Sequence, residues 1–277
     1  MMLAAIGTSQ VIVLLVVGTA AGILGGLLGV GGAIVMIPAM IILLGDHFGP
    51  DSFHAYKLAA NVIVIVVSIP AAARHYREKA VVGRMLPGIM WLSVVGVVAG
   101  VAASSQLVGE RTRLLKQIFG GVMEFVVLVN VCQAWCGAHG ESALRDSCPV
   151  ATRHTLYGLV VGLPAGLVGG VLGVGGGIWA VPAQRLLLGV ALRNAIANSC
   201  VMIVLVSALT ALGQGWVVAH MPSLHSADAY WLSLCLAPGA VLGAWWGAGL
   251  THRLPTGWLR VAFNVLLAVA GVRLILS

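Results

Sequence analysis

Charged side chains are scarce in this chain of 277 residues, since Asp, Glu, Lys and Arg together make up 8% of it. A soluble domain carries about 25% charged residues, so this chain lacks the inventory for a water-facing surface. Hydrophobic residues make up 60% of the sequence, and apolar runs of membrane-spanning length recur from Val11 to Leu276. The composition excludes a soluble globular protein and indicates a helical protein that crosses the bilayer several times.

Several other features are missing. No Lys or Arg precedes Lys57, so the N-terminus lacks the charged region of a cleaved signal peptide, and we expect the first apolar run to remain in the mature protein. The five cysteines are scattered and odd in number, which argues against a disulfide framework. No basic stripe with interleaved aromatics accompanies the net charge of +7, so we expect a lipid bilayer and no nucleic acid as partner. Walker A, nucleophile-elbow and zinc motifs are absent, so we expect no enzyme, cofactor or metal.

Glycine, in contrast, is abundant, and its clusters reveal an internal duplication. Residues 25–38 read GGLLGVGGAIVMIP, and residues 169–182 read GGVLGVGGGIWAVP, the same pattern 144 positions further on. Shorter matches follow in each half, such as Gly-x-x-x-Gly pairs at 96–100 and 239–243. We divide the chain into a first transmembrane repeat (1–136), a connecting loop (137–154) and a second repeat (155–277).

Charged and Pro/Gly-rich stretches divide each repeat into five apolar segments. The predicted segments are about 11–29, 33–45, 57–73, 86–105 and 113–136, then 155–173, 177–190, 194–214, 231–250 and 257–276. The second segment of each repeat would rise only about 20 Å as a helix, less than the ~30 Å hydrocarbon core. We predict an all-α integral membrane protein with about 8–10 hydrophobic segments, including re-entrant or half-helices after the glycine clusters.

Loop charge indicates how the repeats are oriented. Residues 74–84 have a net charge of +3 and the matching residues 215–230 have −1, whereas residues 45–57 have −1 and the matching 185–193 have +2. By the positive-inside rule, matching loops lie on opposite sides of the membrane, so the repeats are inverted. The loops before the last segment of each repeat disagree, because both have +2.

The two glycine loops are the expected centre of function. Glycine leaves backbone N–H groups sterically open and allows positive φ, so several amides can converge on a small anion. Transporters built from inverted repeats place two helix starts, with their partial positive charges, at the substrate near the membrane midplane. The alternative is close helix packing. The substrate-binding candidates in the loops are Gly29, Val30, Gly31, Gly32, Gly173, Val174, Gly175, Gly176 and Gly177.

The motif Gly-x-Leu-Gly-Val-Gly-Gly followed by a proline, present twice, resembles the TauE/SafE family of sulfite and organosulfur anion exporters. The resemblance covers both halves and implies a multi-pass permease of the bacterial inner membrane that exports sulfite, sulfoacetate or a related small sulfur-containing anion. The family follows each glycine loop with Ala-x-x-Thr-Ser, where this chain has Asn61-Val62 and Asn198-Ser199. Asn61, Asn198 and Ser199 are therefore further substrate-binding candidates, with interhelical hydrogen bonding as their alternative role.

Two charged residues within apolar segments complete the candidates. Arg185 lies eight positions beyond Gly177, where its guanidinium could bind an oxyanion or extend to the membrane interface. Glu124 lies in the middle of the fifth segment and is a candidate proton carrier for coupled transport, or a structural hydrogen-bond partner.

Other functions stay open at this stage. Cys132 and Cys136, with His139, lie at helical spacing and could serve a membrane thiol-redox protein, although a metal site lacks a fourth ligand nearby. A channel or a permease for another small anion would use the same glycine loops. All eight histidines lie in or beside predicted loops, so no buried histidine proton relay is expected. The oligomeric state is open, with a homodimer among the options.

Overall fold

The computed structural model describes residues 8–28, 31–45, 51–107, 111–136, 154–221, 224, 226–250 and 256–276. Helices in the first half are α1 (Thr8–Leu28), α2 (Ala33–Leu44), α3 (Ser52–Arg77), α4 (Leu86–Ser105) and α5 (Thr112–Cys136). The second half contains α6 (His154–Tyr157), the π-helical η4 (Gly158–Gly162), α7 (Leu163–Leu172), α8 (Gly177–Leu186), α9 (Leu192–Ala219), α10 (Ser226–Leu250) and α11 (Thr256–Leu276).

The predicted all-α membrane fold is confirmed. Five helical stretches of the described residues are long and apolar enough to cross a bilayer: 52–77, 86–105, 155–172, 193–219 and 227–246. Parts of α1, α2 and α11 form shorter apolar helices. Each predicted segment corresponds to a helix or, for 155–173, to the continuous run of α6, η4 and α7.

The prediction was wrong about where the third segment begins. Residues 45–57 were assigned to a loop, but α3 begins at Ser52, and its first two turns contain His54 and Lys57 with no exposed surface. The expectation that every histidine lies in or beside a loop is therefore wrong for His54. The stretch DSFHAYK (51–57) is too polar for a hydropathy pattern to recognise as part of a helix. The groups that hydrogen-bond to His54 and Lys57 are distant in sequence and include Ser104 of α4 and Leu107 just after it.

Glycines bring α4 against α7, and α1 against α10, with direct backbone contact. A Cβ on Gly96 would lie 2.3 Å from the carbonyl oxygen of Leu163, and one on Gly243 would lie 2.1 Å from that of Thr19. Side chains have no room at such contacts, which is the packing that small-xxx-small motifs provide. The first long helix of each half thus packs against the fourth helix of the other half.

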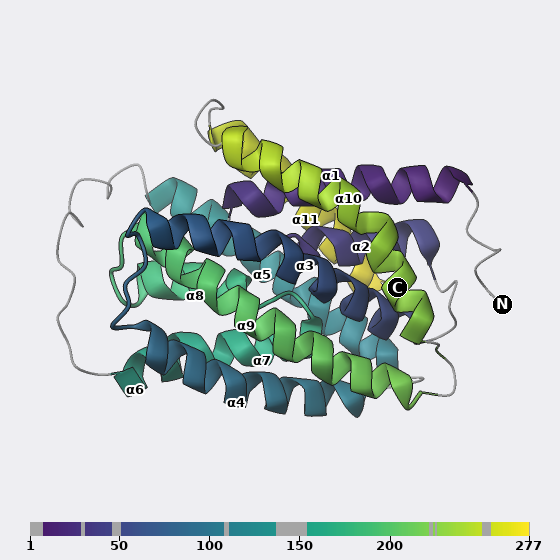
Figure 1. Ribbon diagram of the computed structural model, residues 1–277, viewed down its shortest axis with the longest axis horizontal. Coiled ribbons are helices and arrows are strands. Elements are labelled where there is room, and N and C mark those ends of the chain that lie inside the picture. The colour runs from purple at the N-terminus through teal and green to yellow at the C-terminus, as the bar shows by residue number, and fades with distance from the viewer. Residues whose placement is uncertain are drawn as a thin grey trace.

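Helices α3 and α9 also pack together, in antiparallel orientation. At one end, His54 Nδ1 lies 3.4 Å from Gln214 Oε1, near the C-terminus of α9. Beyond the other end of α3, Glu78 Oε2 lies 3.2 Å from Nη2 of Arg193, near the start of α9. Figure 1 shows both helices extending along the long axis of the molecule.

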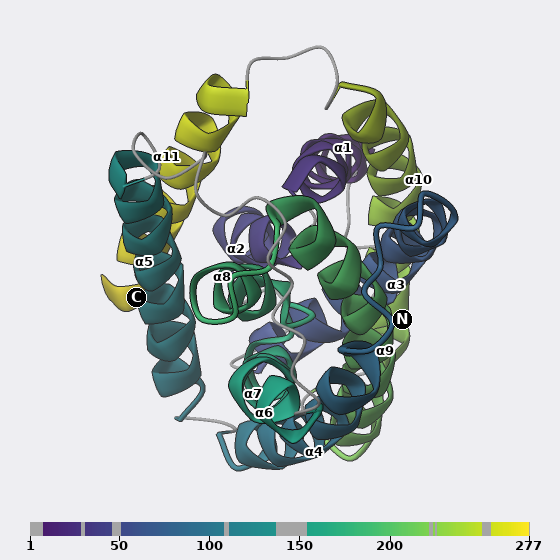
Figure 2. The same cartoon turned by 90° about the vertical axis from the view of Figure 1, so that its left-hand side faces the viewer.

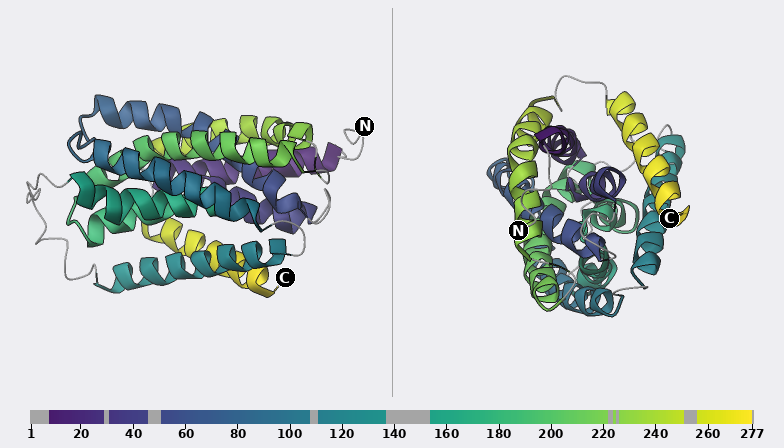
Figure 3. Two further views of the ribbon diagram at one scale, coloured as in Figure 1. Left: turned by 90° about the horizontal axis from the view of Figure 1, so that it is seen from below. Right: turned by 90° about the vertical axis from the view of Figure 1, so that its right-hand side faces the viewer.

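The two short helices, α2 and α8, lie at the centre, surrounded by longer helices (Figure 2 and Figure 3). They have 12 and 10 residues, so each rises only about 15–18 Å, as expected for half-helices. Figure 1 shows them in opposite halves of the molecule along its long axis. Because each follows a glycine loop, both loops are placed near the middle of the bundle.

The glycine contacts predict a clear stability difference between two alanine substitutions. A Cβ on Gly166 would lie 2.2 Å from the carbonyl oxygen of Ser93, so Gly166→Ala must push α7 away from α4. We expect the Tm in detergent to fall by about 5 °C, which corresponds to about 2 kcal/mol. A Cβ on Gly121 would meet no atom within 4 Å, so Gly121→Ala is the matched control and should leave the Tm unchanged or higher. Equal Tm values for the two variants would contradict the packing assignment.

Candidate functional site

The second glycine loop requires glycine for its backbone conformation. The φ angle is +76° at Gly173, +69° at Gly175 and +72° at Gly176. This left-handed region costs an L side chain about 1–2 kcal/mol per residue. In the first loop Gly31 has the corresponding value of +81°, while Gly29 and Val30 lie outside the described residues.

Both loops end by starting a helix in the same way. The carbonyl of Gly32 accepts a hydrogen bond from the Met36 N–H (3.0 Å), and the carbonyl of Gly176 accepts one from the Ala180 N–H (3.2 Å). Gly177 is the first residue of α8. The first turn of each short helix therefore begins at a loop, with N–H groups that have no acceptor within the helix.

The two loops approach each other across one apolar pair, Val64 of α3 and Ile203 of α9. A Cβ on Gly31 would lie 3.4 Å from Val64 Cγ1 and 3.8 Å from Ile203 Cγ2. A Cβ on Gly175 would lie 3.1 Å from Ile203 Cγ2 and 3.6 Å from Val64 Cγ1. The carbonyl oxygen of Val174 lies 3.9 Å from the same Cβ position on Gly31. The predicted loop residues that the structure describes are thus brought together, with the Val64–Ile203 pair between them.

Polar residues occupy the facing sides of α3 and α9 on both sides of this pair. Their spacing of three, four or seven places them on one face of each helix. We call this set the polar seam; it consists of His54, Lys57, Asn61, Ser68 and His75 on α3, and Cys200, Ser207, Thr210 and Gln214 on α9.

Lys57 is the most unusual member of the polar seam. Its ammonium is fully buried, donates hydrogen bonds to Ser104 Oγ and to the carbonyl of Val171 (3.1 Å), and lies 5.5 Å from the centroid of the Phe53 ring. Among the described residues, no carboxylate lies within ion-pair distance of it. A lysine amino group that is buried without a carboxylate partner is costly to charge, and an ionisable residue inside a membrane protein is a functional-site candidate by default. Sequence reasoning missed Lys57 because it was counted as a loop charge.

The amide of Asn61 connects Lys57 to the second glycine loop. Its Nδ2 donates to the carbonyl oxygens of Lys57 (2.8 Å) and Gly173 (2.9 Å). Both amide hydrogens that were expected to face an anion are therefore occupied by the backbone in this conformation. The Oδ1 atom is buried and has no partner, like Ser207 Oγ and Thr210 Oγ1. Buried polar atoms are normally paired, so these three mark places where water or a ligand can bind.

Asn198 and Ser199 lie in a separate, satisfied network. Asn198 Oδ1 accepts a hydrogen bond from the Val82 N–H (2.9 Å), and its Nδ2 donates to Gln184 Oε1 (2.9 Å). Gln184 Nε2 in turn donates to Ser199 Oγ (3.1 Å). These contacts give Asn198 and Ser199 the interhelical hydrogen bonds considered as their alternative role. Gln184, which precedes Arg185, was missed because an amide does not stand out in an apolar segment as a charge does.

Arg185 and Glu124 make no hydrogen bond or ion pair with the polar seam within the described residues. Arg185 is half-buried in the last turn of α8. The Glu124 side chain extends from α5 toward α11, where its Oε1 would lie 2.6 Å from a Cβ on Gly271. This oxygen is buried without a hydrogen-bond partner. Cys132 is exposed, whereas the Cys136 side chain and His139 lie outside the described residues. The part of the chain that the structure describes holds no group of His, Cys, Asp and Glu suited to a metal ion.

Comparison of the sequence with known proteins identifies the family of this chain. The family model for Sulfite exporter TauE/SafE matches residues 14–274. The chain belongs to the TauE/SafE family. It is 25% identical to "Probable membrane transporter protein YunE" of Bacillus subtilis, over 95% of this chain and 97% of that one.

Two further relatives are longer than this TauE/SafE chain. The chain is 25% identical to "Probable membrane transporter protein MamO" of Paramagnetospirillum magneticum over 97% of its length, and 28% identical to MamO of Magnetospirillum gryphiswaldense over 92%. It spans only 45% and 43% of those proteins. No solved structure matches the chain. Family and fold together identify an integral membrane protein of a transporter family.

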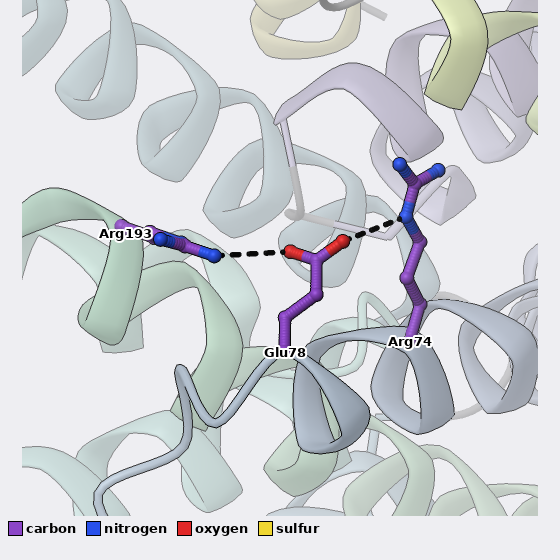
Figure 4. A network of polar contacts seen from close by, with 3 residues as sticks. All are labelled: Arg74, Glu78 and Arg193. Atoms are coloured by element: carbon purple, nitrogen blue, oxygen red, sulfur yellow. Dashed lines mark hydrogen bonds and ion pairs between the residues drawn. The ribbon is translucent and has the colours of Figure 1, made fainter.

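Glu78 joins the two halves at the end of α3 opposite to His54. Its carboxylate accepts hydrogen bonds from Arg74 Nε (3.1 Å) and Arg193 Nη2 (3.2 Å), as Figure 4 shows. Hydrogen bonds from Arg74 and Arg193 hold the pKa of the Glu78 carboxyl below its usual range. The contacts are therefore present at neutral pH and are lost as the pH falls through that lowered value. The two positively charged regions, 74–84 and 185–193, meet at this end.

The Glu78–Arg193 contact predicts specific cross-linking between the halves. In a background without native cysteines, and with a protease site inserted in 137–153, Glu78→Cys with Arg193→Cys should be joined by a bismaleimide that spans about 10 Å. The two halves should then stay together on a denaturing gel after proteolysis. Gln106→Cys with Arg193→Cys is the control, because these residues lie in different halves and at opposite ends of the bundle, so the halves should separate after proteolysis. Equal cross-linking of both pairs would contradict the arrangement.

Proposed function

We propose that this chain is a secondary transporter, and not an enzyme, that moves a small sulfur-containing anion along the polar seam between α3 and α9. One observation carries the proposal: the Lys57 ammonium is fully buried beside the second glycine loop, and no described carboxylate neutralises it. Family membership supports transport. The substrate class, sulfite or a related anion, rests on the doubled glycine motif and the family description.

An oxyanion beside Lys57 would offset the electrostatic cost of a positive charge on this buried amine. The ammonium has three N–H donors, of which two are used by Ser104 and Val171. The hydroxyl groups of Ser207 and Thr210 are buried, have no partner and can donate. Ser207 Oγ also lies 2.8 Å from a Cβ position on Gly175, so the hydroxyl and the loop backbone face the same space. Charge-assisted hydrogen bonds of this kind favour a compact anion.

The arrangement of the halves supports alternating access. Helix α1 packs against α10, and α4 packs against α7. The equivalent helices α3 and α9 run antiparallel, as a twofold axis in the membrane plane would require. Transporters built from inverted repeats place a substrate at the repeat interface and expose it by moving one repeat against the other. We further propose export across the bacterial inner membrane, with Arg185 as a counter-charge and Glu124 as a proton carrier.

Replacing Lys57 tests the proposal directly. In proteoliposomes, Lys57→Met should lower the rate of radiolabelled sulfite flux by about tenfold or more, because the anion loses its counter-charge, and Lys57→Arg should restore part of it. Lys79→Met removes an exposed lysine and should leave the rate within about twofold of the wild type. Size-exclusion chromatography verifies that each variant is folded.

The possible results separate the parts of the proposal. Normal sulfite flux through Lys57→Met would show that Lys57 is structural. If the wild-type protein moves another anion but no sulfur compound, the substrate class is wrong while transport stands. A rate that does not saturate with substrate would identify a channel.

Glu124→Gln tests proton coupling separately. A glutamine keeps the size of the side chain but cannot carry a proton, so we expect flux to lose its dependence on an imposed pH gradient. Asp228, on the first turn of α10, provides the control as Asp228→Asn. Unchanged pH dependence in Glu124→Gln would remove the coupling role.

Replacing Cys132 and Cys136 by alanine should leave flux intact, whereas a thiol-redox function would be lost.

A further inference from the structure

A second polar site lies on the other side of the Val64–Ile203 pair. A cavity of about 30 Å³ is bounded by the first glycine loop and by the facing sides of α3 and α9. Its lining residues are Gly25, Gly31, Val67, Ser68, Ala71, His75, Cys200 and Ile203. The Lys57 site touches the second glycine loop, so each loop has polar side chains of the seam beside it.

The cavity offers hydrogen-bonding groups that the protein itself leaves unused. His75 Nδ1 is a buried atom without a hydrogen-bond partner. The cavity beside it has room for one or more water-sized groups that could bind this atom. Ser68 contributes a hydroxyl, and it is buried like Cys200. The backbone of Gly31 completes the wall, with the positive φ that only glycine adopts readily.

We propose that this cavity is a second station for the transported anion, separated from the Lys57 station by the Val64–Ile203 pair. The inference rests on the proposed function and narrows its substrate class. Such a small cavity favours a compact inorganic oxyanion such as sulfite over a sulfonate with a carbon tail, such as sulfoacetate. The station therefore selects for the size of the anion, while Lys57 selects for its charge.

Cys200 lies in the wall of the cavity, so substitutions at this position test the station. Cys200→Leu fills the cavity with an apolar side chain and should lower sulfite flux by about tenfold or more, whereas Cys200→Ser keeps the volume and should lower the flux much less than Cys200→Leu does. Cys235, on α10, lies outside the cavity lining, so Cys235→Leu is the matched control and should transport normally. Normal flux in Cys200→Leu would overturn the station.

Equilibrium binding tests the station independently of transport. Titration of the detergent-solubilised wild-type protein with radiolabelled sulfite should give two sites per chain. Lys57→Met should remove one of them and Cys200→Leu the other. A single site that Cys200→Leu leaves intact would overturn the second station, even if sulfite transport is confirmed. Two sites in a protein that moves no sulfite would instead support the station and reject the proposed function.

Selectivity gives a further readout. Wild-type flux of sulfite should exceed that of sulfoacetate by about tenfold, and Cys200→Ala, which enlarges the cavity, should reduce that ratio. An unchanged ratio would contradict the size-selecting role.

Discussion

Direct contact between helix backbones determines how this bundle is arranged. At Gly96, Gly166 and Gly243 the neighbouring carbonyl oxygen occupies the space that any side chain would need. In a bilayer, where lipid competes for every apolar surface, such close approach is a principal source of helix association. These contacts join α4 to α7 and α1 to α10. Helices α2 and α8 lie at the centre of the bundle, where α2 packs against α3 and α8 packs against α9.

The helices were largely predictable because hydropathy reports them directly. The fourth segment, 86–105, coincides with α4, and both short helices begin at the predicted residue, 33 and 177. The exception is the start of α3, where the polar stretch that contains His54 and Lys57 ends the apolar pattern. Burial of such groups depends on partners such as Ser104, which no local pattern identifies.

The site was predictable in part. The glycine loops and Asn61 lie together at the centre of the bundle, as predicted. This part of the site could be predicted because glycine clusters are rare within apolar segments and their duplication is visible in the sequence. The polar seam was missed, although its signal was present: residues 54, 57, 61, 68 and 75 repeat with the spacing of one helix face. Asn198 and Ser199 are hydrogen-bonded to Gln184, a choice of partner that depends on how α8 packs against α9.

The apolar pair at the centre has a consequence for the leakage of protons across the bilayer. Protons move rapidly along unbroken rows of water and hydroxyl groups, so a continuous polar path through a membrane protein would let protons leak across the bilayer. Val64 and Ile203 offer no hydrogen-bonding group, and both are almost fully buried between the loops. These two side chains interrupt the row of polar groups along α3 and α9. The membrane can therefore carry this polar seam and still remain tight to protons.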